Sequence, residues 1–433
     1  MDPLTFILES FKNLSPEQKG VFVMLWEFIK TWWWVILPFV LFPLLKVYYH
    51  FWIMSRWDQR QEKIFLEIKI PKEILQPIKA MEYVMAGIHG IHDKPNFREK
   101  WLEGQFQLSI SFEIVGIDGQ PRFFMRVPRR WRTQIESNIY AHYPEAEITQ
   151  VKDYTRNIPQ DIPNRDWDLW GTDLKMTRED PYPIKTYPKF ETERETKEEK
   201  RVDPIANLLE GMSTLKPGEQ LWVQIVVRPI IDEVPWVAQG RKIVDRLVRR
   251  PEPAKSRPIV QEAAETVLFG PQQAGLVERE LIPPEMKLTP GEREIVSAIE
   301  EKIGKFGFSS NIRFIYLAKQ DVFLPSSPVR IAMSLFRALS TLNLNGLKPD
   351  NRTRTKIQWI LRRRRLYIRK RRIFRYYQRR WAPFFPLIRG LFILNTEELA
   401  TLYHFPSRVV APAPGVPRVE AKKGEPPPGL PLE

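Results

Sequence analysis

Cysteine is absent from all 433 residues of the chain, which removes a group of chemistries at once. The protein can form no disulfide, bind no metal through a thiolate and use no cysteine nucleophile. Cysteine-free chains occur on either side of a membrane, so this absence leaves the redox compartment undecided.

Catalytic motifs are missing as well. There is no GxxxxGK[ST] phosphate loop, because Gly304-Lys305 is followed by phenylalanine and no glycine precedes it at the required spacing. No GxSxG turn or Ser-His-Asp order occurs either. His89 and His92, beside Asp93, have the spacing of a metal pair, but they lack an evident third ligand and fit a partly exposed helix end. We therefore expect no enzyme, no ATP hydrolysis, no cofactor and no bound metal.

Acidic residues are missing from one long stretch. Between Asn351 and Thr396 the chain has fifteen Lys and Arg and no Asp or Glu, which equals the whole formal charge of +15. The basic character is therefore local, and the remainder is formally neutral. The overall content of 43% hydrophobic and 12% aromatic residues is enough for two or three domains with cores.

A long apolar segment follows a lead of residues 1–30. Thr31–Met54 reads TWWWVILPFVLFPLLKVYYHFWIM and has a single charge, at Lys46. About 20 apolar residues span a bilayer as a helix, and a lysine near one end can snorkel to the headgroups. Aromatic residues at both edges resemble the belts of a spanning helix. The expected anchor residues are Trp32, Trp33, Trp34, Lys46, Tyr48, Tyr49 and Trp52.

These features predict a single-pass membrane protein, and we expect it in the cytoplasmic (inner) membrane with its soluble part in the cytoplasm. Flanking positive charges balance, so they do not decide the orientation. A buried or interfacial helix is the alternative.

The sequence of residues 62–156 predicts a ferredoxin-like α+β domain with the order βαββαβ. Alternating strands flank two helices of 3.6-residue period, and Asp118-Gly119 marks a hairpin. The expected elements are strand Phe65–Ile70, helix Pro77–Ile91, strands Gln105–Val115 and Arg122–Val127, helix Arg130–His142 and strand Ala146–Val151.

Residues 157–201 have the composition of a linker, and residues 202–350 predict a second α+β domain. A basic helix (351–381), an apolar segment with a docking helix (382–410) and a proline-rich tail (411–433) follow. The expected elements of the second domain are helix Pro204–Met212, strand Gln220–Ile231, helices Trp236–Arg249 and Pro290–Lys305, strand Ile312–Leu317 and helix Val329–Leu342.

The basic helix contains WILRRRRLYIRKRRIFRYYQRRW. Apolar pairs recur in it every seven residues, which predicts one narrow apolar stripe on a cationic helix. The pairs are Trp359/Ile360, Leu366/Tyr367 and Ile373/Phe374, with Trp381 next in phase.

Three interpretations of this helix remain open. It could neutralise nucleic-acid phosphates, lie on anionic lipid headgroups, or dock on the protein by its stripe alone. The residues expected to contact nucleic-acid or lipid phosphates are Arg362, Arg363, Arg364, Arg365, Arg369, Lys370, Arg371, Arg372, Arg375, Arg379 and Arg380.

Thr396–Pro406 predicts a short capped helix with Thr396 as its N-cap and acidic residues in its first turn. We consider both a buried packing helix and a helix that docks on a partner. The expected docking residues are Glu397, Glu398, Leu399, Leu402 and Tyr403.

Several segments carry a resemblance to a known family. They are PKEILQPIKAMEYVMAGIH, WLEGQFQLSISFEI, FFMRVPRRWRTQIESNIYAHYPEAEI, DWDLWGTDL, LEGMSTLKPGEQLWVQIV, and ILNTEELATLYHFPS followed by KKGEPPPGLP. From about Ile64 onward the chain resembles the membrane-anchored region before the ATPase domain of conjugation-like, type IV secretion coupling proteins of uncultured small-genome bacteria, a family without an assigned activity.

The last two segments look like the entry into a DNA-pumping ATPase of the FtsK or HerA kind. Since the chain ends at Glu433, where that domain would begin, the resemblance implies a separately encoded motor ATPase and an oligomer that matches it. We therefore expect a membrane-anchored, non-catalytic subunit of a DNA-transfer machine. The alternative is a peripheral nucleic-acid-binding protein whose apolar N-terminal segment packs on a partner.

Overall fold

The computed structural model describes residues 16–71, 76–190, 203–230, 235–248, 288–358, 361–381, 391–406 and 418–419. The chain divides into a small unit, Met1–Gln61 with Asp93–Phe106, and a large unit that holds the rest. Expectations for residues 1–15, Trp359, Ile360, most of the apolar segment and nearly all of the tail lie outside the described residues.

The small unit is built on one 45-residue helix, α2 (Pro16–Arg60), which includes the whole predicted apolar segment. A π-helical turn, η1 (Glu99–Glu103), packs on its C-terminal part. There the Trp101 ring lies 4.8 Å from the His50 ring and 4.8 Å from Lys46 Nζ. Gly104 has a φ of 73°, and a Cβ on it would lie 2.5 Å from the backbone of Ile53, so glycine permits this close approach.

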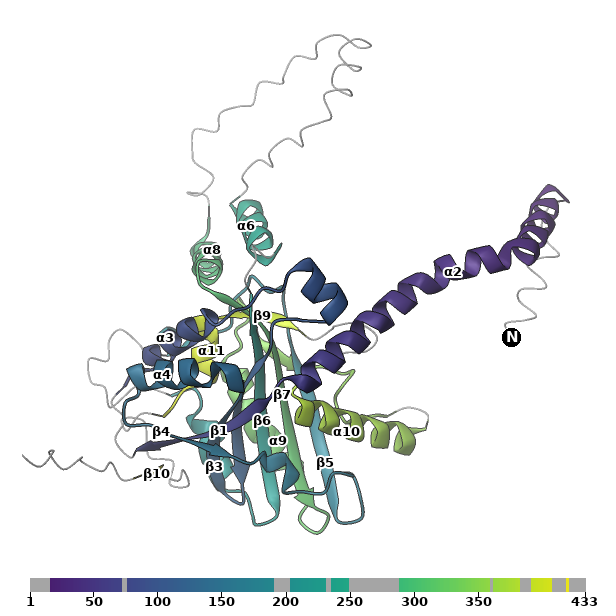
Figure 1. The fold of residues 1–433 in the computed structure, drawn as a ribbon. Coiled ribbons are helices and arrows are strands. Elements are labelled where there is room, and N and C mark those ends of the chain that lie inside the picture. Colours follow the sequence, from purple (N-terminus) through teal and green to yellow (C-terminus); the bar gives the residue numbers. More distant parts are fainter. Residues whose placement is uncertain are drawn as a thin grey trace, which may run out of the picture. The chain divides into compact units, whose positions relative to one another are not determined.

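The first half of the large unit has the predicted order of strands and helices (Figure 1). Its elements are β1 (Lys63–Pro71), α3 (Ile78–His89), β2 (Ile110–Ile117), β3 (Gln120–Pro128), α4 (Arg132–His142) and β4 (Glu147–Val151). Their strands pair antiparallel in the order β4-β1-β3-β2. Asp118 and Gly119 have φ angles of 49° and 81°, as a two-residue hairpin turn requires, so the predicted hairpin is confirmed.

The second half repeats this arrangement. Its elements are β5 (Trp167–Met176), α5 (Ala206–Ser213), β6 (Glu219–Pro229), α6 (Pro235–Leu247), α8 (Pro290–Ile303), β7 (Gly307–Lys319), α9 (Ser326–Ala338) and β8 (Leu347–Pro349). These strands also pair antiparallel, in the order β8-β5-β7-β6. Helices α6 and α8 lie between β6 and β7, where the first half has its hairpin.

Strands β2 and β6 join the two halves into one sheet. They pair antiparallel over eight residues, from Ile110 opposite Val227 to Ile117 opposite Gln220. Strand β9 (Phe392–Asn395) adds to β7, and β10 (Arg418–Val419) pairs with β1, which makes a sheet of ten strands in the described part of the chain. The unit is thus a mixed α+β structure on a mainly antiparallel sheet.

Helices cover both faces of this sheet. Adjacent strand residues point to opposite faces, and Phe112 packs on Tyr403, 5.0 Å between ring centroids, while Glu113 faces α10 (Arg362–Arg379). Helices α3, α4, α5, α9 and α11 (Thr396–Leu402) lie on the Phe112 face. The short 3-10 turns are η2 (Arg129–Trp131), η3 (Tyr154–Arg156) and η4 (Tyr187–Lys189).

One strand lies inside the segment that the sequence marks as a linker. Strand β5 occupies Trp167–Met176 within residues 157–201 and pairs with β7 and β8. Its aspartates interrupt an apolar pattern, which makes the segment look solvated. Asp168 pairs with Lys370 and Asp173 with Arg313, so both charges have partners in the folded protein.

Candidate functional site

The predicted basic helix is α10, and its C-terminal half docks on the sheet. Ile373, Phe374 and Tyr377 are buried in a cluster that also contains Trp222 and Ile315. The apolar stripe is therefore a packing surface over this half of the helix.

The N-terminal half of α10 is exposed. Arg362–Arg365 all lie on the surface, and Tyr367 and Ile368 each keep 45% of their accessible area. The helix begins after Leu361, which has a left-handed φ of 56° and makes no side-chain cap. Four adjacent arginines thus stand in solvent at one end of the helix.

The other predicted phosphate contacts fall into three groups. Arg372, Arg375 and Arg379 are exposed. Arg369, Lys370 and Arg371 are partly buried and already have partners in the protein. Arg380 is buried. The structure therefore leaves seven of the eleven predicted residues on the surface, Arg362, Arg363, Arg364, Arg365, Arg372, Arg375 and Arg379.

Arg380 has a different role from the one predicted. It is 1% exposed, its Nε donates to Glu113 Oε1 at 2.9 Å and its Nη2 donates to Asp153 Oδ1 at 3.0 Å. Burial alone would raise the pKa of Asp153, but Arg380 and the Thr155 N–H and hydroxyl outweigh it and lower that pKa. Arg380 is committed inside the protein and cannot contact a phosphate without leaving this site.

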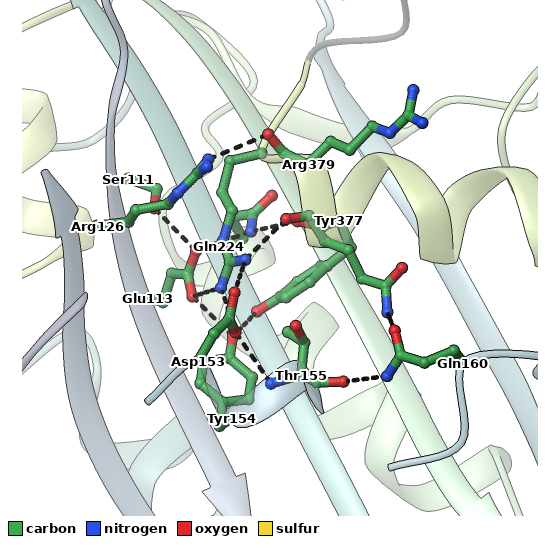
Figure 2. Close-up of polar contacts among 12 residues, drawn as sticks. Ser111, Glu113, Arg126, Asp153, Tyr154, Thr155, Gln160, Gln224, Tyr377 and Arg379 are labelled. Atoms are coloured by element: carbon green, nitrogen blue, oxygen red, sulfur yellow. Dashed lines mark hydrogen bonds and ion pairs between the residues drawn. The ribbon is translucent and has the colours of Figure 1, made fainter. Parts of the chain in front are cut away.

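Glu113 is the centre of this buried network. Its carboxylate accepts from the Ser111 hydroxyl at 2.9 Å, the Tyr154 hydroxyl at 2.8 Å and Gln224 Nε2 at 2.8 Å, besides Arg380 (Figure 2). The Tyr154 and Tyr377 hydroxyl oxygens lie 2.6 Å apart, and burial raises the pKa of both tyrosines. Most of these buried polar atoms have partners in this arrangement, although Gln224 Oε1 has none among the described residues, and their hydrogen bonds fix how α10 sits on the sheet.

Polar side chains continue from Glu113 across the sheet. Glu113 stands opposite Gln224, Gln224 opposite Arg313, and Arg313 opposite Asp173, on four neighbouring strands. Arg313 Nε donates to Asp173 Oδ1 at 2.9 Å, and both side chains are buried. A buried polar row thus lies on the face that α10 covers.

The predicted docking helix is α11, and the structure corrects its role. Residues Thr396–Leu402 and Tyr403 are all buried, including the five predicted docking residues Glu397, Glu398, Leu399, Leu402 and Tyr403. Asn395, not Thr396, is the N-cap and forms a capping box with Glu398. The Glu398 carboxylate also lies 3.0 Å from Lys302 Nζ, both side chains being fully buried. This helix packs inside the unit and presents no docking face.

The predicted anchor residues lie along α2. The aromatic ones keep between 46% and 68% of their accessible area, and they are Trp32, Trp33, Trp34, Tyr48, Tyr49 and Trp52. In the described residues, α2 is the one helix long and apolar enough to cross a membrane, by length and composition. Lys46 lies against Trp101.

Packing contacts hold His89 at the end of α3, whereas His92 lies beyond the helix and is exposed. His89 Nε2 lies 2.9 Å from the Ile230 carbonyl oxygen, and its ring stacks on Phe306 with 4.5 Å between centroids. Burial lowers the pKa of His89. Within the described ranges, no three His, Cys, Asp or Glu side chains gather where they could hold a metal ion.

Comparison with protein-family models assigns the chain to a family. Residues 55–412 match the model of a domain of unknown function, DUF8128, and this match includes strands β1 to β9, α10 and α11. The chain belongs to the DUF8128 family. No curated protein matches it. The DUF8128 description names no activity, secretion system or ATPase, so the resemblance to secretion coupling proteins stays a prediction.

Sequence reasoning missed that α10 carries two kinds of arginine. Helical spacing gave a partial signal, because Ile373 and Tyr377 are four residues apart and share one face, whereas Arg380 follows the end of the helix with a left-handed φ of 54°. An arginine in phase with the buried stripe is a candidate for a buried ion pair, whereas Arg362–Arg365 precede the point where the stripe becomes buried.

Proposed function

We propose that this protein is a membrane-anchored, non-catalytic assembly subunit. The observation that carries the proposal is α2, a 45-residue helix with an uncharged stretch at Thr31–Leu45 and exposed aromatic side chains. Exposed apolar surface of this extent is unfavourable in water, and a bilayer is a solvent that suits it.

The contact with residues 93–106 limits the membrane segment. These residues include lysine, arginine and glutamate side chains, which are costly in hydrocarbon. Since Trp101 packs on Lys46 and His50, α2 leaves the hydrocarbon near Leu45. Thr31–Leu45 alone rises about 22 Å, so snorkelling or bilayer thinning has to complete the span. By length and composition alone the candidate span is Leu37–Arg60, and in this proposal the contact with Trp101 moves the end of the membrane segment from Met54 to near Leu45.

Extraction tests the anchor. The full chain should stay with membranes through an alkaline carbonate wash, and its release would contradict the proposal. Replacing Leu37 and Leu41 with arginine should release a large fraction, because each charge costs about 2.5–3.5 kcal/mol near the centre of a span. Arginine at Leu342, which is 94% exposed in the large unit, is the matched control and should change nothing.

The subunit belongs, in this proposal, to a conjugation-like or type IV secretion DNA-transfer machine and organises a motor ATPase at the membrane. The support is the sequence resemblance together with the exposed arginines of α10. Because α11 is buried, the motor has to contact a different surface. Co-purification with a hexameric ATPase tests the assembly. A chain that remains bound to DNA but leaves the membrane without detergent would favour the peripheral nucleic-acid-binding alternative.

We also infer that both halves of the sheet are ferredoxin-like. The support is the shared antiparallel order, β4-β1-β3-β2 and β8-β5-β7-β6, each with helices on one face. The pairing of α3 with α4 and of α5 with α9 is the same in each half.

A further inference from the structure

A surface hollow of about 380 Å³ lies between α10 and the segment before it. This volume falls within the range of sites that hold small ligands. It is lined by Asn351, Arg354, Lys356, Ile357, Gln358, Arg365 and Arg369.

Four of the lining residues are basic and none is acidic. Two of the guanidinium groups are held in place. Arg369 Nη1 donates to the carbonyl oxygens of Asn351 and Arg354, at 3.1 and 2.9 Å. The Arg354 guanidinium lies 6.0 Å from the centre of the Trp170 ring. Two of the four basic side chains in the hollow are therefore held by contacts, whereas Lys356 and Arg365 are exposed.

Some of this positive charge has no counterpart. Burial lowers the pKa of Arg369, and the nearby Arg365 and Arg372 lower it further, against the effect of Asp350. One oxygen of Asp350 already accepts from the Arg352 N–H at 3.1 Å. Arg354 Nε is buried with no hydrogen-bond partner among the described residues. Positive charges that lie close together repel each other, and a buried N–H donor without a partner is costly. A bound anion would relieve both effects.

We propose that this hollow binds a compact, multiply charged phosphate group of the pyrophosphate or phosphomonoester class. Guanidinium groups bind phosphate oxygens in pairs, and a lysine adds a point charge. The site does not depend on α2, and it uses Arg354 and Lys356, which lie outside the exposed face of α10. It is distinct from diffuse phosphate-backbone binding because it should saturate at one ligand per chain.

Isothermal titration of the full chain in nonionic detergent with pyrophosphate, at low salt, tests the site. We expect one binding event per chain. Arg354→Gln and Lys356→Gln should each weaken it about tenfold or more, as loss of a charge-assisted contact does. Arg375→Gln, an exposed arginine of α10 outside the hollow, is the control and should change affinity less than about twofold. Lys356 is exposed, so its variant stays informative if Arg354→Gln does not fold.

Two further binding experiments distinguish a nucleic-acid phosphate from a lipid phosphate as the natural ligand. An oligonucleotide with a 5′-phosphate is compared with its 5′-hydroxyl form, and vesicles with phosphatidic acid are compared with vesicles of phosphatidylglycerol at equal charge. Preference for either phosphomonoester supports the site and names its source. Absence of saturable pyrophosphate binding, or equal losses in all three variants, would overturn it. Either result leaves the carbonate test of the anchor unaffected.

Discussion

Arg379 and Arg380 are adjacent arginines with opposite environments. Arg379 is exposed, whereas Arg380 lies buried between Glu113 and Asp153. Taking away one member of a buried ion pair leaves the other charge without compensation and costs about 3–5 kcal/mol. We expect Arg380→Met to lower the free energy of unfolding by this amount, and Arg379→Met to change it by less than about 0.5 kcal/mol.

Urea unfolding of the full chain in detergent measures both changes. The double variant Arg380→Met with Glu113→Gln should lose less stability than the sum of the two single variants, because the fully buried charge of Glu113 is gone and only the partly exposed Asp153 keeps its charge. Equal losses for Arg379→Met and Arg380→Met would show that the buried network is not formed in solution.

At the scale of the element, α10 combines a docked half with an exposed one. If Arg362–Arg365 contact phosphates, the logarithm of the affinity for DNA should fall steeply with the logarithm of the salt concentration. The slope of this plot should be about −0.9 for each phosphate that the protein neutralises. Replacing these four residues with glutamine should flatten the slope by up to about three or four. A matched control replaces four exposed basic residues elsewhere in the large unit, Arg156, Lys216, Arg241 and Lys348.

Salt dependence alone does not separate DNA from lipid, because both interactions are screened. DNA binding is therefore compared with binding to vesicles with and without anionic lipid. Binding to anionic vesicles without binding to DNA at low salt would make α10 a second membrane contact. Binding to neither would leave an acidic protein partner for the exposed arginines.

Most helices and strands of the large unit were predictable, because their periodicity and turn residues are local. Strand β5 was not, since Asp168 and Asp173 interrupt its pattern and find their partners on α10 and β7. The role of α11 was also out of reach. Its glutamates are typical of an exposed first turn. Glu398 is instead buried in an ion pair with Lys302, which is far away in the sequence, so no local pattern predicts this burial.

The whole large unit depends on a contact that no local pattern reveals. Pairing between β2 and β6 makes one sheet from two halves, and the polar row of Glu113, Gln224, Arg313 and Asp173 crosses that junction. Each of these residues is a buried polar position on a largely apolar strand, and its partner lies on a neighbouring strand or on the segment after α10, so its role depends on the register of the sheet. The sequence thus predicts the positive charge of α10. It does not predict which arginines of this segment are exposed and which are buried.

Because the sheet is continuous, the two halves of the large unit should unfold together as one cooperative unit. Ile225 lies in β6 opposite Phe112 of β2 and is 1% exposed. Ile225→Ala should cost about 2–5 kcal/mol, as loss of a buried aliphatic side chain does. Native-state hydrogen exchange should show this loss in the slowest amides of β3 and β7 alike, because one global opening exposes both. Leu324→Ala, at a side chain 64% exposed, is the control. Loss of protection confined to β5–β8 would mean that the halves open separately, as two independent domains would.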